Sequence, residues 1–310
     1  MLEIIDLTKK FKQQTVVNKI NMYLEEGEIV GLLGPNGAGK STTISMISSL
    51  LEPTSGDVQL DGKSTIKQPQ KLRNILGVVP QEIALYHELS AKENLMFFGR
   101  IHNLSGKELH DRVAEVLEII GLTDRQKDIV KTFSGGMKRR LNIGIALLHN
   151  PKFIIMDEPT VGIDPQSRNY ILETVKMLNR ERNITVLYTS HYMEEVEFLC
   201  NRIYIMDYGE IIASGTKDEI KHVLSSENTV EVKLQKPSKA FEEALLASND
   251  IRSVTVQDTV MTIIASKNVN ILSVLIPLSE EFGVSFLSFE VKNPTLEDVF
   301  LHLTGRVLRD

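Results

Sequence analysis

The stretch that decides the fold spans residues 34–42 and reads Gly34-Pro35-Asn36-Gly37-Ala38-Gly39-Lys40-Ser41-Thr42. It matches in full the pattern G-x-x-x-x-G-K-S/T, which is typical of a loop that binds phosphate groups. A short apolar run at 28–33, suited to a buried strand, comes before it, and apolar residues at helical spacing come after it. Because the motif requires a strand, the loop and a helix in this order, the sequence predicts an α/β domain that binds a nucleoside triphosphate.

The residue types in this loop suit phosphate binding for physical reasons. Glycine accepts positive φ angles and lets an anion approach the backbone closely, so successive N–H groups can converge on a phosphate. The helix that follows adds roughly half a positive charge at its N-terminus. We expect Lys40 to reach the β- and γ-phosphates, Ser41 to ligate Mg²⁺ and Thr42 to support the α-phosphate.

Composition limits the classes of protein to consider. A chain of 310 residues is long enough for one large and one small domain. No apolar run approaches the ~20 residues that span a bilayer, and acidic residues stand where a signal peptide would be basic. We therefore expect the chain to fold in the cytoplasm. A single cysteine, Cys200, cannot form a disulfide framework or a thiolate metal cluster. A net charge of −6 disfavours a nucleic-acid-binding surface.

The order of the predicted elements divides the chain into two domains joined by a polar linker at 221–228. Residues 1–220 alternate strand-like and helix-like segments, which is typical of an α/β domain. Strands are expected at 28–33, 76–79, 153–156, 184–188 and 202–206, with hairpin turns at 61–63 and 208–210. Residues 229–310 follow the order βαββαβ of a small ferredoxin-like sandwich, with segments at 230–234, 240–247, 251–257, 260–265, 271–282 and 284–290. A last helix is expected over 295–303, where Thr295 and Asp298 have capping-box spacing.

A second constellation follows the apolar run at 153–156, where Asp157 and Glu158 stand at the carboxyl end of a predicted buried strand. Open α/β sheets bind their ligands at this end of the strands. We expect Asp157 to hold Mg²⁺, directly or through water, and Glu158 to polarise a water molecule for attack on the γ-phosphate. Taken alone, the pair would be interpreted as a solvated strand end; the upstream loop favours the catalytic interpretation.

A third element begins at Ser134, which is well suited to cap a helix that opens with Gly135 and Gly136. One interpretation is an ordinary capped amphipathic helix. The other is a second anion site, built from the serine and the glycine amides. Because no second lysine-bearing loop is close to it in the sequence, such a site would complete the nucleotide pocket of another subunit.

These motifs together resemble those of the ATPase subunits of ABC transporters. The resemblance covers residues 2–218 and consists of six elements in the family's order: Walker A at 34–42, the glutamine loop at Gln81, the signature at 134–137, Walker B at 153–158, the D-loop at 161–164 and the switch histidine at His191. Two positions depart from the usual pattern, with Phe133 for leucine and Met137 for glutamine. Since methionine cannot donate a hydrogen bond, we expect Ser134 and the glycine amides to make the phosphate contacts of this motif.

The resemblance implies how two copies would share the nucleotide. Two ATPase domains would pack head to tail, with each ATP between the Walker A loop of one copy and the signature of the other. Gln81 would contact Mg²⁺ or the attacking water and report the nucleotide state to a membrane subunit. His191 would hold the γ-phosphate and the water, and Asp164 would link the two sites.

The resemblance also implies where the adenine lies. Phe11 occupies the family's stacking position, with Val16 or Val17 lining the ring; a place in the core is the alternative interpretation of Phe11. The expected nucleotide contacts are then Phe11, Val17, Gly34, Pro35, Asn36, Gly37, Ala38, Gly39, Lys40, Ser41, Thr42, Gln81, Ser134, Gly135, Gly136, Asp164 and His191. The expected metal ligands are Ser41, Gln81 and Asp157, and the expected catalytic group is Lys40, Gln81, Glu158 and His191.

A helical subdomain at about 84–150 is implied by the same resemblance. Within it, residues 84–131 would meet the membrane partner, and Phe97 and Phe98 belong to a stretch that resembles the family's groove. Exposed apolar residues here would bind a helix of the permease. Plain core packing is the competing interpretation.

The ending of the chain narrows the subfamily. Residues 293–301 and 303–306 resemble the last segment of drug- and antibiotic-resistance exporter ATPases of the daunorubicin-resistance type, which are related to linearmycin and bacitracin exporter ATPases. The resemblance implies a cytoplasmic ATPase, peripheral on the inner face of the cell membrane. It would work as a homodimer, or with a sister ATPase, under ABC-2-type permease subunits and without nucleic acid.

The predicted function is ATP hydrolysis that drives export of a drug, antibiotic or other amphipathic compound through separate membrane subunits. One rival is a soluble ABC protein of translation or DNA repair, but these usually have two ATPase units or a long coiled-coil insertion. Another rival is a P-loop kinase, which Ser134 and His191 disfavour. The sequence leaves the exported compound open.

Overall fold

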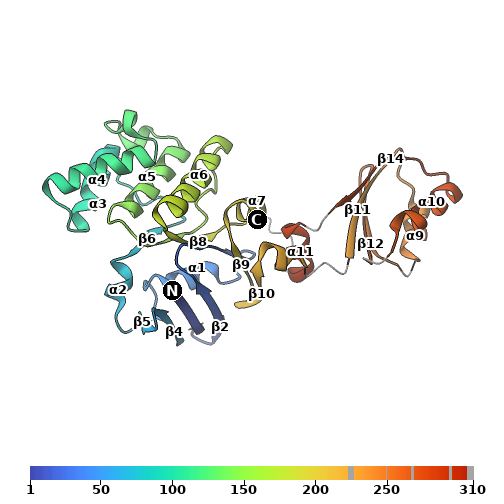
Figure 1. The fold of residues 1–310 in the computed structure, drawn as a ribbon, viewed down its shortest axis with the longest axis horizontal. Coiled ribbons are helices and arrows are strands. Elements are labelled where there is room, and N and C mark those ends of the chain that lie inside the picture. The colour runs from blue at the N-terminus through green and yellow to red at the C-terminus, as the bar shows by residue number, and fades with distance from the viewer. Residues whose placement is uncertain (223–226, 249, 267–268, 293–294, 306–310) are drawn as a thin grey trace. The chain divides into compact units, whose positions relative to one another are not determined.

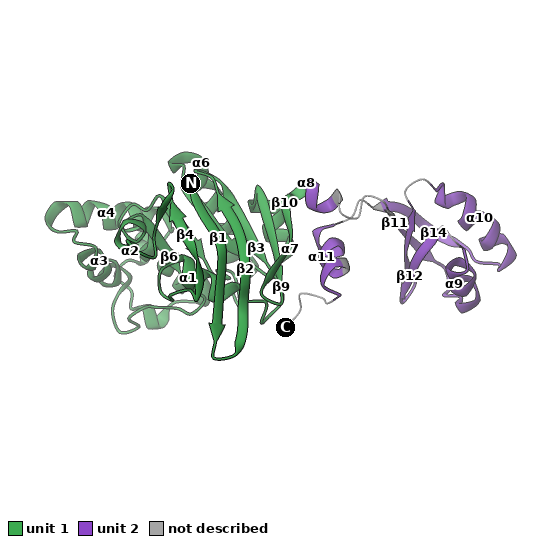
Figure 2. Cartoon of the chain, turned by 90° about the horizontal axis from the view of Figure 1, so that it is seen from below, with its two compact units in different colours: residues 1–217, 306–310 green, residues 218–305 purple. Residues whose placement is uncertain are grey.

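The computed structural model describes residues 1–222, 227–248, 250–266, 269–292 and 295–305. The chain forms two compact units, Met1–Lys217 (unit 1) and Asp218–Gly305 (unit 2), which Figure 2 shows in green and purple. Each has its own hydrophobic core. The predicted linker falls partly outside the described residues, at 223–226, and so do residues 293–294 and 306 of the chain ending.

A six-stranded sheet organises unit 1. Its order is β10-β9-β3-β8-β7-β6, and these strands span Glu210–Thr216, Arg202–Asp207, Ile29–Leu33, Thr185–Thr189, Phe153–Met156 and Leu76–Val79. Neighbours pair in parallel except β10, which forms a hairpin with β9 through the predicted turn at 208–210. Strands β3, β7 and β8 are buried along their whole length, as expected for parallel strands covered on both faces. All five strands predicted in this region lie in the sheet, with ends that differ by at most one residue.

The sheet gathers the predicted site at its carboxyl edge. The loop at 34–39 leaves β3 in the middle of the sheet, and α1 (Lys40–Ile47) begins directly after Gly39. Gly39 has a φ of 106°, which glycine adopts at little cost. The parallel pairing of β7 with β8 then places Asp157 beside Thr189.

A second sheet, absent from the sequence-based expectations, is antiparallel. Its order is β2-β1-β4-β5, with strands at Gln14–Leu24, Leu2–Phe11, Ser55–Leu60 and Lys63–Ser64 (Figure 2). The last two meet at the predicted turn at 61–63. Its apolar face packs with α1 and the six-stranded sheet into the core of unit 1. The register of β1 against β2 shifts three times, so apolar and polar residues do not alternate regularly along β1.

The helices of unit 1 include the predicted helical subdomain, which Figure 1 shows in green at one end of the unit. It consists of α3 (Ala91–Ile101), α4 (Gly106–Ile119) and α5 (Gly135–Leu147), with 3₁₀ turns at Thr123–Arg125 and Val130–Thr132. Ser134 caps α5, as predicted. The other helices are α2 (Pro69–Arg73), α6 (Pro165–Arg182) and α7 (Met193–Leu199). In the described ranges, no helix has the length and hydropathy that a membrane span requires.

Unit 2 has the predicted ferredoxin-like order βαββαβ. After α8 (Lys217–His222), its elements are β11 (Glu227–Leu234), α9 (Lys239–Leu246), β12 (Ile251–Gln257), β13 (Val260–Ser266), α10 (Ile271–Glu281) and β14 (Phe286–Lys292). The strands form one antiparallel sheet in the order β12-β13-β11-β14. A last helix, α11 (Leu296–Thr304), carries the predicted capping box of Thr295 and Asp298.

The start of β14 differs from its expected position by two residues. Val284, predicted as its first residue, instead donates its N–H to the carbonyl of Ser279 and closes the end of α10. Gly283 turns this corner with a φ of 63°. An apolar valine directly after a glycine therefore belongs to the helix end rather than to the strand.

Candidate active site

The predicted phosphate-binding loop lines a pocket of about 250 Å³ at the N-terminus of α1. The lining residues are Val16, Asn36, Gly37, Ala38, Gly39, Lys40, Ser41, Thr42, Gln81 and Glu158. Strand β2, the loop and the segments that follow β6 and β7 thus meet around one cavity. The amides at the helix start and the helix dipole make this pocket favourable for an anion.

Lys40 is buried at the bottom of this arrangement, with 6% of its side chain exposed. Its ammonium group donates hydrogen bonds to the carbonyls of Gly34, at 2.7 Å, and Pro35, at 3.2 Å. Its Nζ also lies 3.8 Å from Oε1 of Glu158. Burial lowers the pKa of Lys40 from its ordinary value, while the nearby carboxylates raise it. The loop therefore holds a desolvated cation beside a carboxylate.

Asp157 is buried next to Thr189, whose hydroxyl donates a hydrogen bond of 2.8 Å to its Oδ1. Burial raises the pKa of the Asp157 carboxyl above its ordinary value. The hydroxyls of Thr189 and Ser41 act in the opposite direction. Oxygen ligands of this kind are the ones that Mg²⁺ prefers, so Ser41 and Asp157 fit the predicted metal site chemically.

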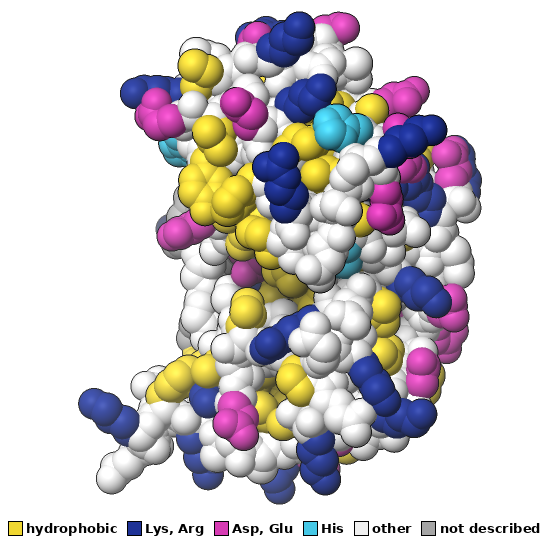
Figure 3. Space-filling model, turned by 90° about the vertical axis from the view of Figure 1, so that its left-hand side faces the viewer, with side chains coloured by type: hydrophobic (Ala, Val, Ile, Leu, Met, Phe, Trp, Pro, Cys, Tyr) yellow, Lys and Arg dark blue, Asp and Glu magenta, His cyan; other side chains and the backbone are white. Residues whose placement is uncertain are grey.

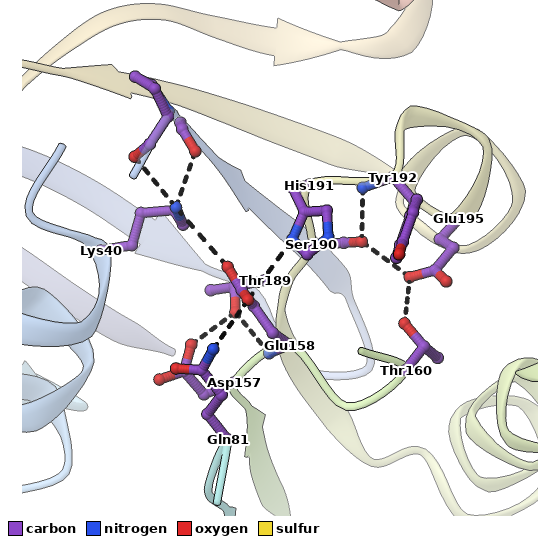
Figure 4. A network of polar contacts seen from close by, with 12 residues as sticks. Lys40, Gln81, Asp157, Glu158, Thr160, Thr189, Ser190, His191, Tyr192 and Glu195 are labelled. Carbon is purple, nitrogen blue, oxygen red and sulfur yellow. Dashed lines mark hydrogen bonds and ion pairs between the residues drawn. The ribbon is translucent and has the colours of Figure 1, made fainter. Parts of the chain in front are cut away.

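Glu158 lies at the centre of the contacts in Figure 4. Gln81 donates from Nε2 to its Oε2 at 3.1 Å, and Nδ1 of His191 lies 3.4 Å from the same oxygen. Its backbone N–H donates to the hydroxyl of Thr189 at 2.9 Å. Its φ of 46° lies in the left-handed region, a strain of about 1–3 kcal/mol that is concentrated at functional sites. The structure thus joins Lys40, Gln81, Glu158 and His191 in one cluster.

The predicted second anion site, at the start of α5, lies outside the pocket that contains Lys40. Ser134 caps α5 by accepting a hydrogen bond of 3.3 Å from the N–H of Met137, and both Ser134 and Gly135 are exposed. Gly136 is buried, and a Cβ at that position would lie 2.0 Å from Oγ of Ser167. None of the residues at 134–137 lines the pocket of Lys40.

Asp164 lies beside the signature residue Gly136 and does not line the pocket. It caps α6 by accepting a hydrogen bond of 2.9 Å from the N–H of Ser167. Such hydrogen bonds hold the pKa of its carboxyl below the ordinary value. Its Oδ2 lies 3.2 Å from the position that a Cβ of Gly136 would take. Within one copy, the D-loop is therefore packed against the signature.

The residues predicted to hold the adenine lie in three different environments: Val16 in the pocket lining, Val17 in the core and Phe11 on the exposed surface of β1. Val16 lines the pocket, whereas Val17 is fully buried beneath Gly39, so the structure favours Val16 of the two valines. Phe11 does not line the pocket; it lies on β1, 47% exposed, with Nζ of Lys9 5.3 Å from its ring centroid. Its stacking role stays a prediction.

Arg139 and Thr189 hold the site in place without having been predicted to do so. Arg139, on α5, is 4% exposed and donates to the carbonyls of Pro80, at 2.8 Å, and Gln81, at 2.7 Å. It therefore fixes the backbone that carries the Gln81 side chain. The available signal was a basic residue on the buried side of an amphipathic helix. For Thr189, it was a hydroxyl directly before the Ser-His pair.

Comparisons with known proteins show which family the chain resembles. The family model for the ABC transporter matches residues 17–161. The chain is 50% identical, over 312 aligned positions covering 100% of both proteins, to the linearmycin resistance ATP-binding protein LnrL of Bacillus subtilis (strain 168). It is 33% identical to the daunorubicin/doxorubicin resistance ATP-binding protein DrrA of Streptomyces peucetius, over 100% of this chain and 94% of that protein. Among solved structures, it is similar to the dimeric post-hydrolysis state of the ATP-binding cassette MJ0796 bound to ADP and Pi, with a TM-score of 0.64 and 30% identity over 70% of this chain and 98% of that chain.

Proposed function

Because this chain belongs to the family of ABC transporter ATP-binding proteins, we propose that two such ATPases close around two shared ATP molecules to drive export. The chain is an ATP-hydrolysing subunit of a transporter of the resistance and export type. The proposed cargo is a drug, antibiotic or other amphipathic compound. The names of its relatives, which include linearmycin and daunorubicin resistance proteins, support that class of cargo.

One observation carries the proposal of a shared site. Lys40, Gln81 and Glu158 line one pocket, while the exposed residues Ser134 and Gly135 lie outside it in the same chain. An exposed helix start that carries a capping serine is well suited to bind an anion. A head-to-tail partner, either a second copy or a sister ATPase, would bring its own Ser134 equivalent over the triphosphate.

We assign Mg²⁺ to Ser41, Asp157 and Gln81, each of which can offer a side-chain oxygen as a metal ligand. In the described residues, no group of three or more His, Cys, Asp or Glu side chains forms a metal cage. This agrees with Mg²⁺, which commonly uses one or two carboxylates together with substrate phosphates. When bound, the ion would neutralise charge on the phosphate oxygens.

Glu158 is the proposed general base. Its carboxylate would accept a proton as the water oxygen bonds to the γ-phosphorus and the bond to the ADP oxygen breaks. Gln81 and His191 both contact its Oε2 and so restrict the direction in which the carboxylate points. Lys40, held by two loop carbonyls, supplies a fixed positive charge to the phosphate.

The proposed docking surface for the membrane subunits is the aromatic surface, defined here as Tyr86, Phe97 and Phe98. Figure 3 shows apolar side chains gathered on the part of unit 1 that carries α3 and α4. Tyr86 is 50% exposed and Phe97 is 38% exposed, and their ring centroids lie 4.8 Å apart. A contiguous apolar patch of this kind suits the apolar face of an amphipathic helix. We propose that this helix belongs to an ABC-2-type permease at the inner face of the membrane.

The experiment that tests the enzymatic role is steady-state ATP hydrolysis by a Lys40→Ala variant. Loss of one preorganised charge typically lowers the rate by ~10²–10³. Lys107→Ala, which removes an exposed lysine from α4, is the matched control and should hydrolyse ATP at the wild-type rate. Unimpaired turnover in Lys40→Ala would refute the assignment of the pocket.

The docking proposal is tested separately by co-purification from membranes. Phe97→Ser should reduce the amount of permease recovered with the ATPase and leave hydrolysis by the isolated subunit unchanged. Leu50→Ser, at an apolar residue 74% exposed outside the aromatic surface, is the control. Equal recovery of permease with both variants would contradict the proposed docking surface.

A further inference from the structure

The buried Glu195 of α7 has partners on two loops of the active site. It is 1% exposed, and its Oε2 accepts hydrogen bonds from three hydroxyls. These are Thr160 at 2.8 Å, Tyr188 at 2.9 Å and Ser190 at 2.8 Å. Figure 4 shows the contacts to Thr160 and Ser190. Thr160 follows the Asp157-Glu158 pair by two residues, and Ser190 directly precedes His191. One carboxylate oxygen therefore connects the loop after β7 to the loop after β8.

The other oxygen of the same carboxylate faces a cation. Oε1 of Glu195 lies 3.4 Å from Nε of Arg168, which belongs to α6. The guanidinium of Arg168 stacks over the ring of Tyr192, 4.5 Å from its centroid. The Tyr192 ring in turn packs against the imidazole of His191, with 4.3 Å between centroids. Glu195 is thus also connected to His191 indirectly, through Arg168 and Tyr192.

These contacts restrict the histidine loop from both sides. Besides donating to Glu195, the Ser190 hydroxyl accepts a hydrogen bond of 2.9 Å from the N–H of Tyr192. The two residues flanking His191 are therefore both oriented, while His191 itself remains 23% exposed and 3.4 Å from Glu158. A buried carboxylate is costly unless it is paired. For Glu195, three hydroxyls of segments around the site donate to Oε2, while Oε1 has the Arg168 cation at 3.4 Å but no hydrogen bond within the part of the chain that the structure describes.

We propose that Glu195 is a positioning residue for ATP hydrolysis, which acts by holding His191 toward Glu158 and by connecting the loop after β7, at Thr160, to the histidine loop after β8. Glu195 is not among the residues that line the pocket. The inference rests on the proposed role of His191 at the γ-phosphate. A change at Glu195 should therefore act through His191 and lower kcat more than it alters KM for ATP.

The test is a double-mutant cycle between Glu195→Gln and His191→Ala in the full-length protein. Glutamine keeps the size of the side chain but removes the charge that faces Arg168 and the three hydroxyls. We expect Glu195→Gln to lower kcat roughly tenfold and to change KM for ATP by no more than about twofold. In the His191→Ala background it should have no further effect, because the group that it positions is absent. Glu194→Gln, one residue earlier and exposed, should be silent in both backgrounds.

An equal loss of kcat in both backgrounds would overturn the proposal, because it would show a structural effect independent of His191. Wild-type turnover in His191→Ala would instead refute the role of His191, and with it the proposed mechanism. If Glu195→Gln does not fold, Ser190→Ala provides the same cycle, because it removes one of the three hydroxyls and leaves the buried charge paired. Its effect on kcat should likewise disappear in the His191→Ala background.

Discussion

At the scale of single residues, the two adjacent carboxylates after β7 have different surroundings. Asp157 continues the strand and receives the Thr189 hydroxyl. Glu158 turns away through a left-handed backbone angle and faces Lys40 and His191. These surroundings support the proposed division of roles, in which Asp157 holds the metal ion and Glu158 accepts the proton. Thr189 serves both, because its hydroxyl also accepts the N–H of Glu158.

Thr189→Val should therefore affect both carboxylates at once. The variant has nearly the same shape but lacks the hydroxyl, so it costs about 1–3 kcal/mol in folding free energy by leaving the N–H of Glu158 unpaired. Burial already raises the pKa of Asp157, and loss of the Thr189 hydrogen bond should raise it further. The acid limb of the kcat/KM profile should move to higher pH. Thr189→Ser keeps the hydroxyl and should keep the wild-type profile; an unshifted profile in Thr189→Val would contradict this account.

The loop at 34–42 supplies most of the pocket lining, so Lys40 could be identified from its local sequence. Gln81 also lines the pocket, but it lies outside this loop and was identified only through the resemblance to the ABC ATPase family. Thr189 and Arg139 could not be predicted in the same way, because their contacts depend on the pairing of β7 with β8 and on the packing of α5. Neither partner is near them in the sequence.

At the scale of elements, α5 and α6 pack closely at the glycine of the signature. A Cβ at Gly136 would lie 2.0 Å from Oγ and 2.3 Å from Cβ of Ser167, whereas a Cβ at Gly135 would meet its nearest neighbour at 3.8 Å. Only the second glycine is therefore required by packing within the chain. The exposed Gly135 is free to serve a partner.

Gly136→Ala should destabilise unit 1 by about 1–3 kcal/mol, because α6 must move to accommodate the added methyl group. Gly135→Ala should leave the free energy of unfolding unchanged. Urea unfolding of the two variants measures the difference. Ser167→Gly in the Gly136→Ala background removes both clashing atoms and should restore part of the loss; absence of any restoration would contradict the packing explanation.

A histidine pair joins the end of α3 to the segment before β7. The rings of His102 and His149 stack 4.2 Å apart, and Nε2 of His149 donates to the carbonyl of Leu76 at 3.0 Å. Burial, with smaller contributions from His102 and Arg112, lowers the pKa of His149 from 6.5 to about 4, although the hydrogen bond to Leu76 acts in the opposite direction. In the unfolded chain, His149 is therefore protonated as the pH falls below about 6.5. In the folded chain, it is protonated only when the pH falls to about 4.

Stability from this group is complete above pH 6.5 and is lost as the pH falls toward about 4. We expect the wild type to lose more free energy of unfolding between pH 7 and pH 5 than His149→Gln, which keeps an amide donor but does not titrate. Urea unfolding at the two pH values measures both losses. Equal losses in the two proteins would show that His149 does not titrate differently on folding.

Elements were predictable where the apolar pattern was simple. The central strands are short buried runs, and their ends came within one residue. The antiparallel sheet was not predicted, because register shifts in β1 interrupt the alternation of apolar and polar residues. The late start of β14 has a similar cause, since a hydrogen bond at the end of α10 takes Val284 out of the strand.

At the scale of the whole molecule, the chain has two cores that share no residue. All the residues that line the pocket belong to unit 1. We therefore expect truncation after Asp218 to leave ATP hydrolysis intact while it alters the stability or regulation of the dimer. Hydrolysis by the truncated protein and its sedimentation with ATP measure these effects. Loss of hydrolysis in a folded truncated protein would show that unit 2 contributes to the site.

The order of elements in unit 2 and the parallel strands of unit 1 followed from the sequence, because they depend on local apolar patterns. Pairing between two copies does not leave such a pattern. It is inferred from an exposed Ser134 and Gly135 that have no phosphate-binding lysine beside them in the same chain. The exported compound could not be predicted from this chain, because its binding residues are expected in the membrane subunits.

The most direct test of the shared site is the mass of a Glu158→Gln variant in the presence of ATP and Mg²⁺. This variant should bind ATP without hydrolysing it, and gel filtration with light scattering should give twice the chain mass of 34.9 kDa. Adding Ser134→Glu, which places a negative charge at the phosphate-binding helix start, should return the variant to a monomer. A Glu158→Gln chain that binds ATP and still has a mass of 34.9 kDa would contradict the account.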